Sequence, residues 1–284
     1  MAPDIWFPNL GIELFNVSRV AFSIFGFNIY WYAVMIILGI IAAYIAAIIE
    51  VKRTGQRRDD YTDILVMGLP FVLVGLRLFY VIFNWELFRD NPIRIITGIR
   101  DGGLAIFGGI IASIIFVYVF SRRRKLNAWL VLDVGAPSFA LGQAIGRWGN
   151  FINREAFGGF TDNLFAMRIV RGQTGMPLTP EIIANTVVYH NVEYIQVHPT
   201  FLYESLWSLG LFAILTIYRP RKKFNGQIFW LYLLGYGFGR FFIESLRTDQ
   251  LLMGSIPASQ AVAALMVVAA VTAMALQKFL WSKA

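Results

Sequence analysis

Hydrophobic residues fall into seven long runs that are separated by shorter polar stretches. The runs cover residues 27–49, 61–83, 102–120, 129–151, 199–217, 228–245 and 259–279. A helix rises about 1.5 Å per residue, so each run is long enough to cross roughly 30 Å of hydrocarbon, with 228–245 the tightest fit. The pattern predicts an all-α integral membrane protein with about seven transmembrane helices. We treat residues 1–284 as a single membrane domain.

Lysine and arginine gather in alternate connections between the runs. Basic clusters occur at 52–58, 122–125 and 219–223, and Lys278 and Lys283 follow the last run. The other loops are poorer: 84–101 has three basic residues and 246–258 has one. Cytoplasmic loops carry the excess of positive charge. We therefore predict that the N-terminus lies outside and the C-terminus lies in the cytoplasm.

The longest polar connection is residues 152–198, which contain glycine, proline, threonine and asparagine throughout. A stretch of this length is too long for a simple connector. It predicts a small extracytoplasmic head inserted between the fourth and fifth spans. Residues 5–25 and 84–101 are predicted to lie along the membrane interface. Asp4 and Glu13 stand where a cleavable signal peptide would need basic residues.

Composition agrees with a membrane protein and excludes several kinds of site. The chain is 57% hydrophobic and 15% charged, whereas soluble domains carry about 25% charge. Its net charge is +8, but the basic residues form short clusters and no basic face, so we predict no nucleic-acid binding. Without cysteine there is no disulfide, thiolate metal site or cysteine nucleophile. Two histidines and no metal-ligand spacing predict neither metal nor cofactor.

Polar and glycine-rich positions within the runs gather at one depth. Such groups are costly inside a membrane and usually have a function. Given the predicted orientation, five spans contribute them to the outer half of the membrane, which predicts one cavity open to the outside. The residues are Tyr32, Gly102, Gly103, Gly108, Arg147, Asn150, His198, Tyr203, Glu204, Tyr236, Arg240 and Glu244.

Two arginines stand out within this set. Tyr236, Arg240 and Glu244 share one helix face at i, i+4 and i+8, and Arg147 shares a face with Asn150 at i, i+3. Arginine offers a planar fork of donors and stays charged at any working pH. Two arginines at similar depth on different helices are suited to holding the phosphate of a lipid headgroup.

A purely structural role is an open alternative for each residue taken alone. Arg240 and Glu244 would then neutralise each other, and Arg147 would extend outward beside Glu155. Arg77 lies near the outer end of the second run with no motif around it, so we interpret it as a snorkelling residue. The agreement in depth across five spans favours a functional site.

Four motifs stand out along the chain. The most specific is GRWGNFINREAFGG at 146–159, and the others are IYWYAVM at 29–35, HPTFLYE at 198–204 and YGFGRFFIESLRTD at 236–249. Together they resemble one bacterial enzyme family, the prolipoprotein diacylglyceryl transferases. The resemblance covers the chain from about Tyr30 to Asp249. It implies transfer of the diacylglyceryl group of phosphatidylglycerol to the lipobox cysteine of a preprolipoprotein, with release of glycerol phosphate, as the first step of lipoprotein maturation. It also implies a bacterial cytoplasmic membrane location, with the active site facing the outer leaflet.

The resemblance assigns roles to individual positions. Arg147 and Arg240 are expected to contact the phosphatidylglycerol phosphate. The remaining expected catalytic or substrate-binding residues are Tyr32, Asn150, Glu155, Glu204, Glu244, Tyr236, Gly158, His198, Gly102, Gly103 and Gly108. Many family members have histidine in the glycine-rich run where this chain has Phe107. A base role at that position is therefore absent here or belongs to another residue.

The implied chemistry leaves the general base open. A thiol has a pKa of about 8.5, and cationic surroundings favour its thiolate, so the arginines serve the nucleophile as well as the phosphate. Glu155, Glu204 and Glu244 are all candidate bases, with Glu244 the preferred ion-pair partner of Arg240 at i, i+4. Two other functions compete. A transporter places its site near the midplane between repeats, and we find no repeat. An intramembrane hydrolase would need a nucleophile, and the spacing of residues in this chain singles out none.

Overall fold

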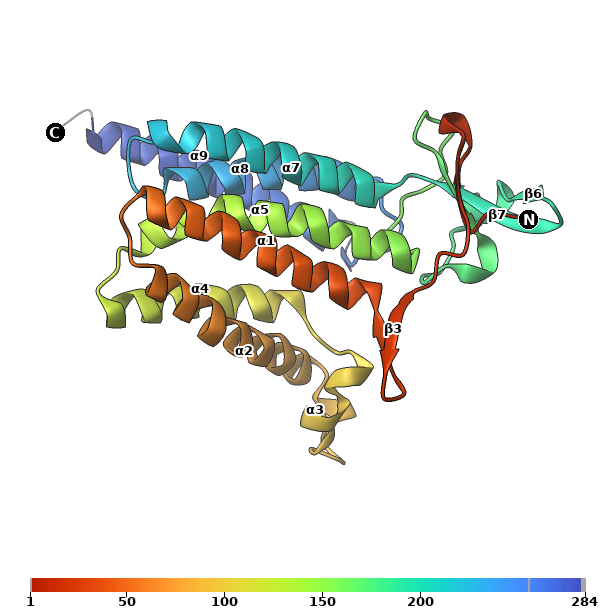
Figure 1. Cartoon of the computed structure of the whole chain (residues 1–284), viewed down its shortest axis with the longest axis horizontal. Coiled ribbons are helices and arrows are strands. Elements are labelled where there is room, and N and C mark those ends of the chain that lie inside the picture. Colours follow the sequence, from red (N-terminus) through yellow and green to blue (C-terminus); the bar gives the residue numbers. More distant parts are fainter. Residues whose placement is uncertain (1, 255, 282–284) are drawn as a thin grey trace. The chain divides into compact units, whose positions relative to one another are not determined.

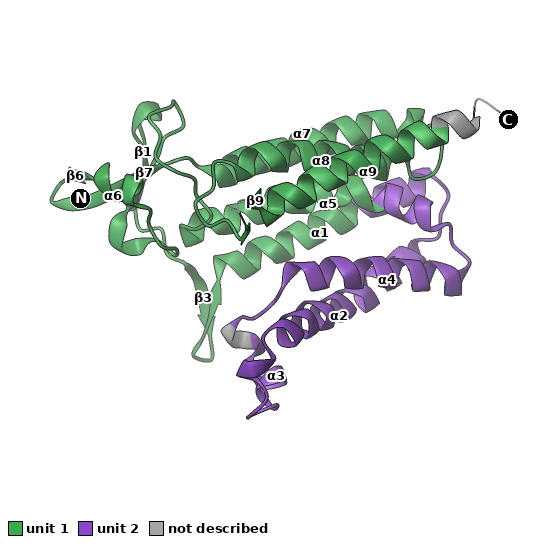
Figure 2. Cartoon of the chain, turned by 180° about the vertical axis from the view of Figure 1, so that it is seen from behind, with its two compact units in different colours: residues 1–45, 135–284 green, residues 46–134 purple. Residues whose placement is uncertain are grey.

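The computed structural model describes residues 2–254 and 256–281, and most of them are helical (Figure 1). Lys283, one of the two basic residues that follow the last run, lies outside the described residues. The chain divides into two compact units, residues 1–45 with 135–284 and residues 46–134 (Figure 2).

Seven helices of 18 residues or more occur among the described residues, and they coincide with the seven predicted runs to within about four residues. Six of them are long and apolar enough to cross a membrane. The other, α8, carries Arg240 and Glu244 within 18 residues, and these charges lower its mean hydropathy. The helices are α1 (Trp31–Arg53), α2 (Arg58–Phe83), α4 (Ile106–Arg124), α5 (Ala128–Asn153), α7 (Thr200–Tyr218), α8 (Gln227–Glu244) and α9 (Ala258–Trp281).

In the unit of residues 46–134, helices α2 and α4 pack closely. A Cβ atom on Gly75 would lie 2.9 Å from the carbonyl oxygen of Gly108, so both helices need glycine at their crossing. Short helical turns, including α3 (Arg94–Thr97), connect them. Helix α4 begins four residues later than predicted, because Gly102 and Gly103 adopt φ of +99° and +74° and hold the chain out of the helix.

Arg77 on α2 does not snorkel, and that interpretation was wrong. Its side chain is buried, with 6% of the residue exposed. The guanidinium donates hydrogen bonds to four backbone carbonyl oxygens in the segment that joins α2 to α4, with N···O distances of 2.8–3.0 Å. It also lies over the ring of Phe88 at 5.2 Å. Arg77 therefore fixes the connection that leads into the glycine-rich run.

Replacing Arg77 with lysine is expected to lower stability. An ammonium has three donors and cannot reach four carbonyl oxygens, and each buried acceptor left unpaired costs about 1–3 kcal/mol. We expect the melting temperature in detergent to fall by about 2 °C or more. Arg94→Lys is the matched control, since the Arg94 side chain is exposed. Equal melting temperatures for the two variants would contradict the assigned role of Arg77.

The other unit contains α7, α8 and α9 together with most of α5. Helix α8 packs against both α7 and α9. The buried side chains include Ala136, Ala140, Leu211, Leu215, Ile228 and Tyr232. The indole Nε1 of Trp207 donates to the carbonyl oxygen of Gly235 at 2.9 Å. Its ring lies where a Cβ on Gly239 would be, so glycine at 239 lets α7 and α8 approach.

Residues from both sides of α5 form a small antiparallel sheet in the same unit, with strand order β2-β1-β5-β7-β6. Its strands are β1 (Ile5–Phe7), β2 (Ile12–Leu14), β5 (Met167–Val170), β6 (Val187–Tyr189) and β7 (Val192–Val197), with the short helix α6 (Pro180–Ala184) beside them. The buried core of this head includes Ile5, Phe157, Ile169, Ile182, Ile195 and Val197.

The sheet changes two predictions. The fold is mostly helical, not entirely helical, and residues 5–14 belong to the head sheet. Two further hairpins are present, β3 (Val20–Ile24) with β4 (Phe27–Tyr30), and β8 (Leu252–Met253) with β9 (Ile256–Pro257). Because residues 27–30 form β4, the first long helix begins at Trp31 and not at residue 27.

Candidate active site

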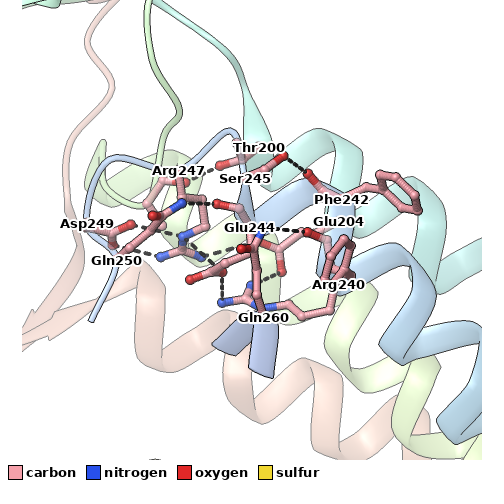
Figure 3. Close-up of polar contacts among 12 residues, drawn as sticks. Thr200, Glu204, Arg240, Phe242, Glu244, Ser245, Arg247, Asp249, Gln250 and Gln260 are labelled. Carbon is pink, nitrogen blue, oxygen red and sulfur yellow. Dashed lines mark hydrogen bonds and ion pairs between the residues drawn. The ribbon is translucent and has the colours of Figure 1, made fainter. Parts of the chain in front are cut away.

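A buried carboxylate, Glu204 on α7, lies at the centre of a cluster of arginines. Its Oε2 atom is 2.5 Å from Nη2 of Arg147 on α5 and 3.0 Å from Nη1 of Arg240 on α8. Its Oε1 atom is 3.3 Å from Nη1 of Arg247, which follows α8. Figure 3 shows Arg240 and Arg247 converging on this carboxylate. Arg147 lies 93 residues before Arg240 and 100 residues before Arg247 in the sequence, so only tertiary packing brings these arginines together.

Two more carboxylates complete the cluster. Glu244 Oε2 is 2.5 Å from Nη2 of Arg240 and 3.9 Å from Nε of Arg247. Asp249 accepts two hydrogen bonds from Arg247, at 2.9 and 2.7 Å. The predicted pairing of Arg240 with Glu244 is therefore present. Three guanidinium groups face three carboxylates, so their formal charges cancel, which is what burial of so many charges requires.

Arg247 was not among the predicted site residues, although it stands in the motif at 236–249 and belongs to this cluster. Its position beyond the eighth helix gave no helical spacing to the other charged residues. Burial favours a lower pKa for the Arg247 guanidinium, but the hydrogen bond to Asp249 and the charges of Asp249, Glu204 and Glu244 outweigh it and raise that pKa above its usual range. Burial likewise acts to raise the pKa of Asp249, yet Arg247 holds it below its ordinary value.

Gly158 holds the segment of Arg247 in place from the head. The N–H group of Gly158 donates to the carbonyl oxygen of His198 at 2.9 Å, and that of Gly159 donates to Leu246 at 2.9 Å. A Cβ on Gly158 would lie 2.6 Å from the Leu246 carbonyl oxygen and 2.8 Å from Cβ of His198. Only glycine fits between these chains without a shift, so Gly158 sets how closely Arg247 approaches the cluster.

Glu155 does not pair with Arg147, which contacts Glu204 instead. The Glu155 Oε1 atom accepts hydrogen bonds from Nδ2 of Asn150 at 2.9 Å and from Nδ2 of Asn153 at 3.4 Å. Asn150 is one helical turn beyond Arg147 on α5. The outward snorkelling considered for Arg147 is therefore not what the structure has.

The aromatic site residues lie around this cluster. Tyr236 stacks on Tyr232 with ring centroids 5.7 Å apart, and it borders a small cavity of about 10 Å³ together with Glu204 and Arg240. The Tyr32 ring packs where a Cβ on Gly149 would be, at 2.8 Å from Cδ2. Tyr32 thus packs against α5, which carries Arg147, and Tyr236 lies on α8, which carries Arg240.

His198 lies apart from the arginines. Its Nδ1 atom is 3.3 Å from the hydroxyl oxygen of Tyr203 and 3.4 Å from Nδ2 of Asn163. Burial lowers the pKa of His198 below its ordinary value, so its ring is neutral at pH 7. Within the residues that the structure describes, no three histidine, aspartate or glutamate side chains are grouped as ligands for a metal ion.

Comparison with known proteins decides the family. Residues 19–276 match the sequence model of the family described as prolipoprotein diacylglyceryl transferase.

The chain belongs to this family.

Three relatives carry the name phosphatidylglycerol–prolipoprotein diacylglyceryl transferase. The protein of Finegoldia magna is 44% identical over 90% of this chain and 94% of its own length. That of Clostridium novyi is 43% identical over 89% and 93%, and that of Enterococcus faecalis is 42% identical over 91% and 90%. The family resemblance predicted from the four motifs is confirmed.

Three expected substrate-binding glycines of this transferase lie in the unit of residues 46–134. Gly102 and Gly103 accept hydrogen bonds from Arg77 through their carbonyl oxygens, and Gly108 packs against Gly75 on α2. Contacts with α2 in the same unit therefore give each of the three glycines a structural role. Their contact with substrate stays a prediction.

Phe107, in the glycine-rich run at the start of α4, packs beside Phe79 with ring centroids 6.4 Å apart. Replacing Phe107 with leucine is expected to leave turnover within about threefold of wild type, because an apolar side chain of similar volume costs little and no proton transfer is lost. The measurement is diacylglyceryl transfer to a lipobox peptide. Complete loss of transfer by a well-folded Phe107→Leu variant would mean that the aromatic ring itself is needed.

Proposed function

We propose that this chain transfers the diacylglyceryl group of phosphatidylglycerol to the lipobox cysteine thiol of a preprolipoprotein, with the arginine cluster as its active site. Family membership supports the reaction, and the name of the relatives supplies both substrates. The product is a thioether-linked lipid on the cysteine, and glycerol phosphate is released. This is the first step of lipoprotein maturation.

The observation that carries the proposal is the shared oxygen of Glu204. Arg147 and Arg240 come from different helices, yet both direct a guanidinium nitrogen at Oε2, at 2.5 and 3.0 Å. An anionic oxygen at that point is thus held by two guanidinium groups at once. A phosphate oxygen that takes the place of Oε2 receives the same two charge-assisted hydrogen bonds. We assign Arg147 and Arg240 as the residues that bind the phosphate.

The reaction then follows from charge. The cysteine sulfur of the substrate attacks the glycerol carbon that bears the phosphate ester, so a C–S bond forms and the C–O bond to phosphate breaks. The thiol proton goes to a base, and the electron pair of the broken bond stays on the leaving phosphate monoester. The two guanidinium groups stabilise the negative charge that develops there. Positive charge nearby also favours the attacking thiolate.

Among the three candidate carboxylates, we assign Glu155 as the proton acceptor. The oxygens of Glu204 and Glu244 face guanidinium groups of the cluster. Glu155 instead receives amide hydrogen bonds on Oε1, and no described residue donates a hydrogen bond to its Oε2. That oxygen is available for a substrate thiol, and Asn150 orients the carboxylate.

The membrane arrangement that we propose keeps the orientation predicted from the basic loops. Helix α8 is the seventh span, because it packs along α7 and α9, which are long and apolar enough to cross. The N-terminus and the head face outward and the C-terminus faces the cytoplasm. The arginine cluster lies where α5 and α8 end and α7 begins. With the predicted orientation, this supports our proposal of an active site at the outer leaflet of the bacterial cytoplasmic membrane.

Removing the charge of Arg247 is expected to weaken phosphatidylglycerol binding. Arg247→Gln leaves three carboxylates against two guanidinium groups, so Glu204 holds Arg147 and Arg240 more strongly against an incoming phosphate. Hydrogen bonds to charged groups contribute about 1.5–3 kcal/mol, so we expect KM for phosphatidylglycerol to rise roughly tenfold or more. Arg171→Gln is the control, because its ion pair with Glu193 is solvent-exposed. An unchanged KM in Arg247→Gln would contradict this role.

The test of the function uses purified protein in detergent with phosphatidylglycerol and a synthetic lipobox peptide. The peptide mass and the release of glycerol phosphate are followed for wild type and for Arg240→Ala. A diacylglyceryl mass gain on the cysteine that is absent in the variant supports both the reaction and the site. No product under conditions in which the Finegoldia magna relative turns over would refute the proposal.

A further inference from the structure

A second polar pocket lies in the head, outside the arginine cluster. Its volume is about 470 Å³. It is bordered by the start of the chain, by the segment between β2 and β3, by the residue after α5 and by the short turn after β5. The lining residues are Asp4, Asn16, Val17, Ser18, Arg154 and Gln173. Five of the six are polar, which distinguishes this pocket from an apolar lipid site.

Two buried atoms of this pocket have unused hydrogen-bonding capacity. Arg154 is 4% exposed, and its Nε atom has no hydrogen-bond partner. The Oε1 atom of Gln173 is also buried without a partner. The other groups are engaged: Arg154 Nη2 donates to the Val17 carbonyl oxygen at 2.7 Å, and Gln173 Nε2 donates to Asp4 at 3.3 Å. A buried donor and a buried acceptor left unpaired in one pocket call for an explanation.

A peptide group supplies the complement of these two atoms. Its carbonyl oxygen accepts one hydrogen bond and its N–H group donates one. The Arg154 donor and the Gln173 acceptor therefore match the main chain of a bound polypeptide, whatever its side chains. Main-chain recognition of this kind does not depend on which side chains follow the cysteine.

The pocket is adjacent to the proposed active site through α5. Arg147 and Asn150 lie on the last turns of α5, which ends at Asn153, and Arg154 precedes Glu155 directly. Six helical steps and one further residue separate Arg147 from Arg154, a path of about 13 Å. An extended chain covers about 3.3 Å per residue. A cysteine that reacts near Arg147 therefore brings the third or fourth following residue to Arg154.

We propose that this head pocket binds the main chain of the preprolipoprotein at the third or fourth residue after the lipobox cysteine. The inference rests on the proposed function, since it places the cysteine at the arginine cluster. The head then holds the polar side of the substrate while the membrane helices hold its apolar side and the lipid.

The test compares three lipobox peptides at saturating phosphatidylglycerol. One ends as an amide directly after the cysteine, one continues for four residues, and one is the longer peptide N-methylated at its third and fourth residues. In wild type, the extension is expected to lower the peptide KM roughly tenfold, and N-methylation is expected to remove that gain. Equal KM values for the short and the long peptide would overturn the proposal.

The variant for this test is Gln173→Ala, which spares Arg154 and the active site. It is expected to remove the advantage of the long peptide and to leave kcat and KM for the short peptide, and KM for phosphatidylglycerol, at wild-type values. A structural defect would change the values for both peptides. Arg171→Gln, in the same turn but outside the pocket lining, is expected to keep the advantage. Persistence of the advantage in Gln173→Ala would contradict the inference.

A measurement without turnover separates this inference from the function. The long peptide carries benzophenone at its fourth residue after the cysteine and is photo-crosslinked to the protein. Crosslinks within residues 16–18 or 171–173 support the pocket, and crosslinks confined to other segments overturn it. If no peptide gains a diacylglyceryl group, the proposed function fails. If transfer occurs but neither KM nor crosslinking depends on the extension, only the pocket assignment fails.

Discussion

Arg240→Lys is expected to lose about 100-fold in kcat/KM for phosphatidylglycerol. The guanidinium of Arg240 contacts Glu204 through Nη1 at 3.0 Å and Glu244 through Nη2 at 2.5 Å. It thereby spans two carboxylates in a fixed plane and presents one edge to the phosphate position. Lysine keeps the charge but concentrates it in one ammonium group, which cannot keep both contacts. Losing one or two charge-assisted hydrogen bonds of about 1.5–3 kcal/mol each gives a loss of this size.

The matched control for Arg240→Lys is Arg221→Lys, an exposed residue on the turn after α7. Initial rates of glycerol phosphate release are measured over a range of phosphatidylglycerol concentrations for both variants. Melting temperatures are compared with wild type, so that misfolding is recognised. Near-normal kcat/KM in a folded Arg240→Lys protein would mean that a point charge is sufficient, and the two-arginine clamp would be wrong.

Gly158→Ala is expected to reduce turnover at least tenfold, because it changes the position of Arg247 without touching a charged group. The added Cβ would meet the Leu246 carbonyl oxygen at 2.6 Å and His198 Cβ at 2.8 Å. The first neighbour is a backbone atom and the second is bonded directly to the backbone, so neither can turn aside as a flexible side chain could. The segment 246–249 must therefore move away. Moving Arg247 then disturbs its contacts with Glu204 and Asp249. Strain of this kind costs about 1–3 kcal/mol, which corresponds to roughly 5–150-fold.

Gly159→Ala is the control for Gly158→Ala. A Cβ on Gly159 would meet no atom within 4 Å, and alanine keeps the N–H group that donates to Leu246. We expect its turnover and melting temperature to stay near wild type. If both alanine variants behave alike in the transfer assay, the close approach at Gly158 does not control the active site.

The pairing of charges in the arginine cluster also explains why the proposed active site is stable before substrate binds. Removing one partner from a buried charge network leaves an uncompensated charge and is costly. Here each arginine has a carboxylate partner, and Glu204 is shared by all three. An entering phosphate can replace one oxygen of Glu204 while Arg247 retains the other. Glu204 thus keeps an arginine partner both before and after phosphate binds. In an isolated Arg240–Glu244 pair, a phosphate that displaced the carboxylate would leave it without a partner.

The sequence alone determined the helical framework and the family. Apolar runs of membrane-spanning length follow from local composition, so all seven long helices coincide with predicted runs. The i, i+4 spacing of Arg240 and Glu244 is a property of a single helix, and their pairing was predicted correctly. The β6–β7 hairpin has a local signal in the sequence: β-branched and aromatic residues flank His190 and Asn191, which both adopt positive φ in its two-residue turn.

Only the tertiary structure decided what joins distant segments. The pairing of β1 with β5 links residues more than 150 positions apart, and no local pattern specifies it. Arg247 joins the arginine cluster because Gly158 and the head fix the segment after α8. Glu204 proved to be the common partner of three arginines on separate segments, where spacing had offered Glu155 to Arg147. Helix periodicity orders the residues of one helix, but the packing of α5, α7 and α8 selects which charges meet, since burial requires every charge to find a partner.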